Sequence, residues 1–171
     1  MMRFNWIAGF IFTLGVAHAA PTASQVVVLK NGKGEAVGNA TLTPLAKGVK
    51  IILDLHGLTP GEHAVHFHEK GLCTAPKFES AGGHFAPLKS KHGFDIEGGP
   101  HAGDMANFFA SADGTAKVEL INSSVSLGAG ADSLVKSGGA ALMIHEKADD
   151  YKSQPAGEAG GRFACGEIKG T

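Results

Sequence analysis

The 171-residue sequence is poor in several features, and each shortage excludes a class of protein. Its 15 basic and 16 acidic residues nearly balance, so charge gives no support for binding to nucleic acid or to an anionic membrane surface. The sequence has no amphipathic helical pattern, internal repeat or low-complexity tail. Aromatic residues other than phenylalanine are scarce, whereas glycine occurs 25 times. Many glycines with few charges suit a β protein with many turns.

The sequence also lacks an apolar run long enough to cross a bilayer comfortably, which takes about 20 residues. The run at 6–16 is shorter; it follows the basic residue Arg3 and precedes Ala17-His18-Ala19, a small-x-small cleavage motif. This layout predicts a secretory signal peptide over residues 1–19 and one mature domain over 20–171. We therefore expect an exported protein without membrane association after cleavage, the alternative being an uncleaved anchor.

Cysteine is scarce too, since Cys73 and Cys165 are the only two. In an exported protein an even pair predicts a disulfide. Such a bond would close a long loop, for which the chain-entropy model gives a stabilisation of roughly 4–5 kcal/mol. The alternative is a pair of buried free thiols.

Short runs with β-forming residues recur between turn signals, at 26–29, 36–45, 49–55, 62–69, 105–111, 115–121, 140–146 and 161–168. Asp113-Gly114 lies between two of these runs and predicts a hairpin turn. Eight short strands without a convincing helix predict an all-β antiparallel sandwich or barrel.

Two segments break this rhythm and are expected to be long functional loops. Residues 70–104 are rich in Gly, Pro and His, and residues 147–160 are shorter and polar. Long loops in a compact domain are usually functional or disordered. Because the first loop contains Cys73 and three histidines, we interpret it as held by a disulfide and a metal ion.

The histidines of the predicted domain form a pattern of their own. His66 and His68 flank Phe67 on an expected strand, where residues i and i+2 point to the same face about 6–7 Å apart. Two imidazoles on one face can reach one metal ion. Alternatively, two such side chains are ordinary polar residues on a solvent-facing strand.

Further histidines lie on glycine-rich loops and at a strand end. His84 follows Gly82-Gly83, whose backbone can approach a ligand closely. His92, His101 and Asp104 come next, and three imidazoles with one carboxylate suit tetrahedral zinc. His145 ends an expected strand, and several imidazoles without thiolates suit copper(II). His56 and His63 lie outside this pattern and are interpreted as surface or hydrogen-bonding histidines.

Several motifs together resemble one family over essentially the whole predicted domain. They are Gly61 to Gly71, Ser80 to Phe85, Pro100 to Asp104, Ser126-Leu127 with Asp132 to Leu134, Ile144 to Tyr151, and Gly160 to Gly166. They resemble the copper/zinc superoxide dismutases, the bacterial periplasmic branch in particular. The resemblance implies an eight-stranded Greek-key, immunoglobulin-like sandwich or barrel. It also implies a periplasmic oxidoreductase that converts two superoxide ions to dioxygen and hydrogen peroxide and protects against superoxide outside the cytoplasm.

The same resemblance implies one copper and one zinc ion per subunit, in a monomer or a homodimer. The copper ligands would be His66, His68, His84 and His145. The zinc ligands would be His84, His92, His101 and Asp104, so that His84 bridges the two ions as an imidazolate and passes a proton to the product.

The remaining implied residues support this centre. Asp149 would link the copper ligand His66 to the zinc ligand His92, and Arg162 would lie near the copper, where a permanent cation attracts an anionic substrate. Cys73 and Cys165 would form the family's internal disulfide. We take Arg162 and His84 as the catalytic residues.

The sequence departs from the family pattern in three places. Ala64-Val65 replace a Gly-Phe pair before the first copper histidine, which indicates repacking with the ligands unchanged. Glu158 adds a negative charge before the arginine, and residues 94–97 contain two further acids. These charges bear on the rate with an anionic substrate more than on the presence of the activity.

Two alternatives from other classes remain at this point. One is a periplasmic copper or zinc buffer that uses the same ligands without useful turnover. The other is a structural adhesion domain of the sandwich class, since a fold does not fix a function. An adhesion domain has no need for six such histidines, and metal analysis of the purified protein separates it from the other two.

Overall fold

The computed structural model describes residues 23–170, and within this range regular structure consists of strands and one short 3-10 turn. The strands are β1 (Gln25–Asn31), β2 (Ala36–Pro44), β3 (Val49–Leu55), β4 (Gly61–His63), β5 (Val65–His68), β6 (Phe108–Ala110), β7 (Ala116–Asn122), β8 (Ala140–His145) and β9 (Arg162–Ile168). The 3-10 turn is η1 (Glu79–Ala81). No helix in residues 23–170 is long and apolar enough to cross a membrane. The predicted signal peptide lies outside the described residues.

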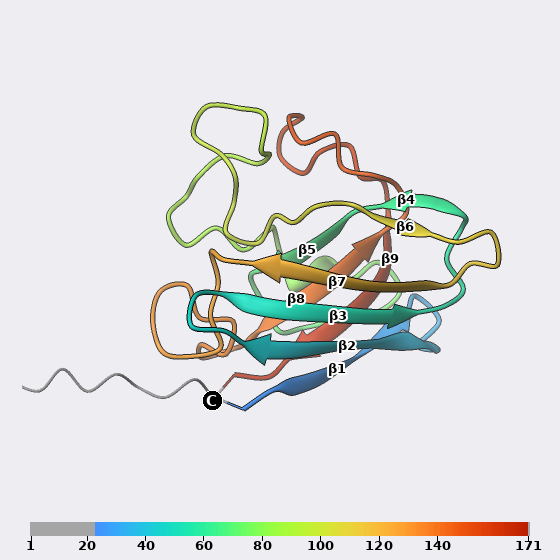
Figure 1. The fold of residues 1–171 in the computed structure, drawn as a ribbon, viewed down its shortest axis with the longest axis horizontal. Coiled ribbons are helices and arrows are strands. Elements are labelled where there is room, and N and C mark those ends of the chain that lie inside the picture. The colour runs from blue at the N-terminus through green and yellow to red at the C-terminus, as the bar shows by residue number, and fades with distance from the viewer. Residues whose placement is uncertain (1–22, 171) are drawn as a thin grey trace, which may run out of the picture.

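The strands form a curled antiparallel sheet (Figure 1). One sheet has seven strands in the order β5-β8-β9-β1-β2-β3-β7, and a second sheet pairs β4 with β6. The two sheets are continuous along the chain, because β6 turns into β7 at Asp113-Gly114 and Ala64 alone separates β4 from β5. The strands therefore surround one core, and the prediction of an all-β antiparallel sandwich or barrel is confirmed.

Element boundaries differ from the sequence prediction in three places. The expected strand 62–69 is divided at Ala64, whose N–H donates to Lys147 O over 2.8 Å. This break lets β4 pair with β6 while β5 pairs with β8. The expected strand 105–111 is shorter in the structure, where only β6 is a strand. Residues 123–139 form a third long connection beside the two loops that the sequence predicted.

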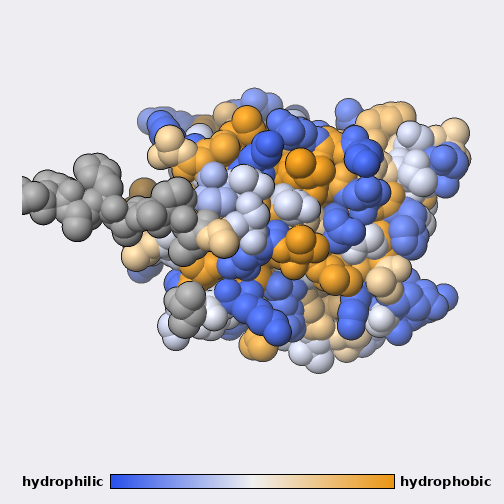
Figure 2. All heavy atoms as spheres, turned by 60° about the horizontal axis from the view of Figure 1, so that its bottom comes forward, coloured by the Kyte–Doolittle hydropathy of each residue, from blue (hydrophilic) through white to orange (hydrophobic). Residues whose placement is uncertain are grey.

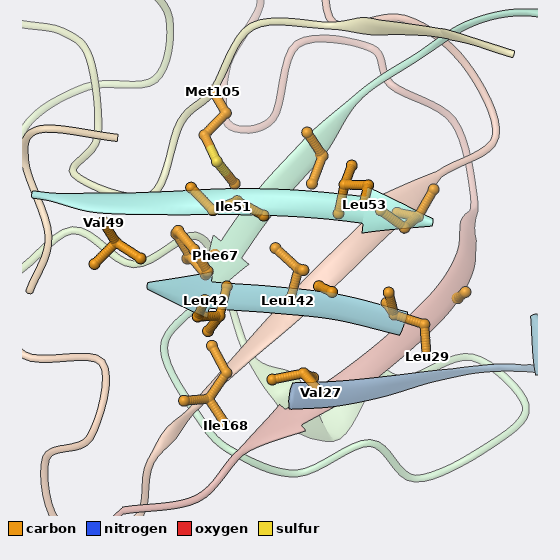
Figure 3. Close-up of a cluster of buried hydrophobic side chains, with 14 of the residues drawn as sticks. Val27, Leu29, Leu42, Val49, Ile51, Leu53, Phe67, Met105, Leu142 and Ile168 are labelled. Carbon is orange, nitrogen blue, oxygen red and sulfur yellow. The ribbon is translucent and has the colours of Figure 1, made fainter. Parts of the chain in front are cut away.

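Apolar side chains from both sides of the curled sheet fill its interior (Figure 3). Phe67 on β5 and Leu142 on β8 lie in the same buried cluster as Leu42 on β2 and Ile51 on β3. Strands β1 to β3 show the alternation expected of a sheet with one wet face, whereas every residue of β5 and β8 is buried. Another part of the chain must therefore cover the outer face of β5 and β8.

The long loop between β5 and β6 provides part of that cover. Cys73 and Cys165 form the predicted disulfide, with an S–S distance of 2.01 Å, which ties this loop to β9. Phe78 from the loop packs in a second buried cluster with Ala141 and Met143, on the outer face of β8. The wall formed by β5, β8 and β9 thus lies between the barrel core and a covering loop.

Among residues 23–170, no loop gives comparable cover to the opposite side of the molecule, around β1 and β2. The outward side chains of Val26 and Val28 on β1 are 69% and 52% exposed. Figure 2 shows this side turned forward, with hydrophobic residues in small patches between hydrophilic ones. The buried histidines all lie elsewhere in the described chain, toward β5 and the long loops.

Candidate metal centre

The first histidines of the centre are positioned by two neighbouring strands. On β5, Phe67 points into the core, so His66 and His68 point to the outer face, as the i, i+2 spacing predicted. His145 ends the adjacent strand β8, and its N–H donates to Ala64 O over 2.9 Å. Three imidazoles from two strands therefore gather at one end of the outer face.

The long loop adds His84 to this group by pairing with β5. The N–H of Phe85 donates to Phe67 O over 2.8 Å, and His84 forms a bridge with His68. The ring of His84 lies 4.0 Å from that of His66, measured between centroids. The first group is thus His66, His68, His84 and His145, with one ligand atom from each residue lying within 4.8 Å of all the others.

His84 also belongs to a second group, which gathers around one carboxylate. Asp104 Oδ1 lies 2.9 Å from His84 Nδ1 and 3.4 Å from His101 Nδ1. Asp104 Oδ2 lies 3.1 Å from His92 Nδ1. These four residues again bring their ligand atoms within 4.8 Å of one another. The two groups therefore share the ring of His84.

The ring nitrogens left without hydrogen-bond partners give a test of whether metal ions fit. They are His66 Nδ1, His68 Nε2, His84 Nε2, His92 Nδ1, His101 Nδ1 and both ring nitrogens of His145, all buried. Leaving a buried polar atom unpaired costs about 1–3 kcal/mol, so a cluster of such atoms is compatible with ligands awaiting a metal. Four imidazoles suit copper(II), and three imidazoles with a carboxylate suit zinc. Both donor sets fit.

Asp149, from the loop between β8 and β9, joins the two groups from behind. Its Oδ2 lies 2.8 Å from His66 Nε2 and its Oδ1 lies 3.0 Å from His92 Nε2. The side chain of Asn107 binds both main-chain groups of Asp149, each over 2.9 Å. Because both imidazoles use Nε2 on Asp149, each keeps Nδ1 directed to its own group, which fixes ring orientation.

Burial keeps most of the first group neutral and therefore able to bind a metal. Burial lowers the pKa of His84 to about 4 and that of His145 to about 2, and it holds the pKa of His68 well below its ordinary value. A neutral imidazole keeps the lone pair that a metal requires.

The carboxylates beside the second group are held in the charged form. Burial raises the pKa of Asp104, but contacts with His101, His84 and His92 outweigh it and hold the pKa far below its ordinary value. Burial likewise lowers the pKa of His92, but Asp104 and Asp149 outweigh it and raise the pKa to about 9. The two carboxylates therefore favour a positive charge at His92, which a metal ion can supply once it displaces the proton from the ring.

Arg162 lies at the start of β9 and is anchored to the covering loop. Its Nη1 donates to Phe78 O over 2.6 Å, and its Nη2 donates to Gly82 O over 2.7 Å. Gly82 O also lies 3.0 Å from His68 Nδ1, so one carbonyl oxygen contacts both the guanidinium and a histidine of the first group. Burial lowers the pKa of Arg162, which remains far above neutrality for a guanidinium.

Other residues contribute to the centre although the sequence did not point to them. His63 is buried and is a hydrogen-bonding histidine, which was one of its two interpretations from the sequence; its Nδ1 lies 2.7 Å from His145 O and its Nε2 2.8 Å from Thr59 O, which holds the backbone of His145 in place. Gly157 lies against the Asp149–His92 pair. The contacts of His63 with His145 and of Gly157 with His92 join residues distant in sequence, so no local pattern could have found them. Glu158 is exposed.

The fold and the two groups together define an antiparallel β protein whose outer wall carries two adjoining groups of residues able to hold metal ions. The family model for copper/zinc superoxide dismutase matches residues 36–168. A curated relative, superoxide dismutase [Cu-Zn] 1 of Aquifex aeolicus, is 45% identical over 169 residues, which covers 98% of each chain.

Solved structures agree with this match. A double mutant of a superoxide dismutase-like protein from Bacillus subtilis superposes with a TM-score of 0.83 at 40% identity, covering 85% of this chain and 97% of that one. The copper/zinc superoxide dismutase of Brucella abortus superposes with a TM-score of 0.71 at 30% identity, covering 85% and 99%.

The chain belongs to the copper/zinc superoxide dismutase family. The sequence predictions of this family, of an oxidoreductase acting on superoxide and of copper and zinc as cofactors are confirmed at this level. The predicted fold of the family is confirmed by the two structural neighbours.

Proposed function

We propose that this chain is an exported superoxide dismutase in which the first group binds copper and the second group binds zinc. Copper is held by His66, His68, His84 and His145, and zinc by His84, His92, His101 and Asp104. The observation that carries the proposal is the sharing of His84: its Nδ1 lies beside Asp104, and its Nε2 is buried without a partner. A single imidazole in that arrangement can serve two ions.

The reaction takes two superoxide ions and two protons to dioxygen and hydrogen peroxide. When bound, copper supplies the one-electron redox chemistry and zinc supplies a fixed charge without changing oxidation state. The protein residues supply geometry and protons. His84 can hold a proton at Nε2 next to the substrate position, and Asp149 keeps His66 and His92 in single orientations through their Nε2 atoms.

Arg162 attracts and orients the anionic substrate. Two of its nitrogens are engaged by Phe78 O and Gly82 O, which leaves the remaining N–H groups of the fork for superoxide. A guanidinium held by two carbonyl oxygens is pre-organised, so little side-chain entropy is lost when substrate arrives.

We further propose that residues 1–19 are a cleaved signal peptide and that the mature protein, from residue 20, acts in the periplasm against superoxide formed outside the cytoplasm. The Cys73–Cys165 disulfide is consistent with an oxidising compartment. Monomer or homodimer stays a prediction, as does the absence of nucleic-acid and membrane partners. Mass spectrometry of the protein isolated from cells would show whether the chain begins after Ala19.

The decisive experiment measures superoxide decay with mature protein loaded with copper and zinc, against the same protein loaded with zinc only. We expect fast decay that requires copper and that is lost in His145→Ala, because His145 belongs to the copper group alone. Equal rates for the two preparations, with copper confirmed as bound, would contradict the catalytic proposal. The protein would then be a metal buffer that retains the family fold.

A further inference from the structure

Gln154, in the loop between β8 and β9, makes a contact that none of the roles above requires. Its side-chain amide binds the main chain of His92: His92 N–H donates to Gln154 Oε1 over 3.1 Å, and Gln154 Nε2 donates to His92 O over 2.8 Å. This exchange of two hydrogen bonds is the one that a neighbouring antiparallel strand would make. No strand of the described part of the chain pairs with the segment around His92.

The second proton of this amide is also engaged. Gln154 Nε2 donates to Lys152 O, in its own loop, over 3.0 Å. Both N–H donors and the carbonyl oxygen of the side chain are therefore in use, which fixes the direction of the amide. A side chain with a fixed direction can hold its partner in place, even though Gln154 lies at the surface.

The same loop holds the neighbourhood of His92 at further points. Asp149 binds the ring through Nε2, and Asp95 N–H donates to Tyr151 O over 3.1 Å. Gly93, next to His92, has a φ of 102°, and a Cβ there would overlap Tyr151 O, so the two backbones are in direct contact. The segment 92–95 is thus bound along its length by residues 149–154.

We propose that Gln154 is a positioning residue for the zinc ligand His92. The main chain of His92 is held by Gln154 and its ring by Asp149, which directs Nδ1 at the second group, 3.1 Å from Asp104 Oδ2. The zinc site thereby depends on the loop that also carries Asp149. This role rests on the proposed function, because it takes His92 as a zinc ligand.

The experiment measures how fast zinc leaves the copper- and zinc-loaded mature protein to a chromophoric chelator. We expect Gln154→Ala to release zinc about tenfold faster, since partners outside the ligand shell typically change metal affinity by about 10–100-fold. Gln154→Glu keeps the acceptor for His92 N–H but places a carboxylate oxygen against His92 O. This variant should release zinc at least as fast as Gln154→Ala. Copper should be retained in both variants.

Ser153→Ala is the matched control. Ser153 Oγ donates to Asp150 Oδ2 over 2.5 Å within the same loop and makes no side-chain contact with His92. We expect zinc release within about twofold of the unaltered protein, because main-chain contacts to His92 are unchanged. Equal acceleration in Ser153→Ala and Gln154→Ala would overturn the proposal, since any loosening of the loop would then have the same effect.

Two readouts separate failure of this role from failure of the zinc assignment. Amide hydrogen exchange at His92 in the metal-free protein should rise in Gln154→Ala, and the visible spectrum of cobalt(II) in the zinc site should change. If His92→Ala still binds zinc as the unaltered protein does, the zinc assignment is wrong and this role with it. If zinc binding needs His92 but neither exchange nor release depends on Gln154, only the positioning role is overturned.

Discussion

Gly157 shows how little room surrounds the hydrogen bond between Asp149 and His92. A Cβ at this position would overlap the carboxylate of Asp149 and lie 2.6 Å from His92 Nε2. The φ of 71° is also one that side chains other than glycine rarely adopt. We expect Gly157→Ala to weaken zinc binding by about 10–100-fold, by displacing this partner of His92. Competition titration with a zinc chelator measures the change.

The control for Gly157 is a glycine that has a similar positive φ but no neighbouring atoms where a Cβ would lie. Gly34 has a φ of 82° and nothing within 4 Å of the position of a Cβ. Gly34→Ala should lower the free energy of unfolding by about 1–2 kcal/mol and leave zinc affinity unchanged. If Gly157→Ala behaves in the same way, the close packing on Asp149 is not what matters.

The role of Arg162 can be tested separately from that of the proposed copper ligands beside it. Arg162→Ala should lower kcat/KM for superoxide by at least about tenfold, because a nearby cation raises the encounter rate of an anion. Arg162→Lys keeps the charge but cannot bind Phe78 O and Gly82 O with a planar fork. Its rate should therefore lie between those of the unaltered protein and Arg162→Ala. Copper content should stay constant. Pulse radiolysis over a range of ionic strength would measure both rate and salt dependence, and unchanged rates would refute the substrate role.

At the residue scale, the sequence alone predicted the site best where local spacing determines which way a side chain points. The i, i+2 spacing of His66 and His68 placed both on one face, as the structure has them. The residues of 70–104 suggested His84 and Asp104 as metal donors, but the sharing of His84 between two groups required the family resemblance, since no local pattern shows where the loop returns to β5. Gln154 lies 62 residues from its partner and was missed, because contacts to main-chain groups carry no residue signature.

At the scale of elements, the disulfide and the covering loop act together. The loop carries Phe78 O and Gly82 O, which anchor Arg162, and the Cys73–Cys165 bond ties it to β9. We expect the double variant Cys73→Ser, Cys165→Ser to lower the free energy of unfolding by up to about 4–5 kcal/mol. Dismutation should also slow at full copper occupancy, because the carbonyl oxygens that hold Arg162 become free to move.

Denaturant titration and rate measurements on this variant can be compared with the native protein after reduction by dithiothreitol. The two should agree, because both lack the same bond. A serine variant with native stability and native rate would mean that the packing of Phe78 on Ala141 and Met143 holds the loop without the disulfide.

Most strand limits were predicted well, and the errors lie where another element intervenes. β1 to β3 and β7 to β9 lie within two residues of their predicted limits. The division between β4 and β5 depends on Lys147 O, which is distant in sequence from Ala64, and so was not visible. The complete burial of β5 and β8 likewise follows from the covering loop, which a period-2 pattern cannot reveal.

At the scale of the molecule, the buried histidines make the metal-free protein sensitive to acid. The folded-state pKa values of His84, about 4, and His145, about 2, lie below the ordinary 6.5. Above pH 6.5 both histidines are neutral, which is the form that the folded protein favours. As pH falls below 6.5, the free energy of unfolding decreases by about 1.4 kcal/mol per pH unit for each histidine. Urea titrations of metal-free protein between pH 7 and pH 4 would measure this loss.

His92 has the opposite sign, and so the metal-free protein should also lose stability on the alkaline side. Its folded-state pKa is raised to about 9, so its contribution is complete below pH 6.5 and disappears as pH rises through 9. Urea titrations extended to pH 10 should show a maximum of the free energy of unfolding near neutrality. In Asp149→Asn the alkaline loss should shrink, because one of the two carboxylates that raise this pKa is gone. A flat profile between pH 7 and pH 10 would contradict the account.

The proposed metal ligands all lie on the outer wall or on loops, outside the interior hydrophobic cluster that closes the barrel. Hydrophobic burial inside and the disulfide outside complete the scaffold from the chain's own atoms. Folding can therefore precede metal binding: the barrel can form before any ion is present, and the ions can then bind from outside, one at a time. A protein built in this way can be synthesised in one place and completed in another.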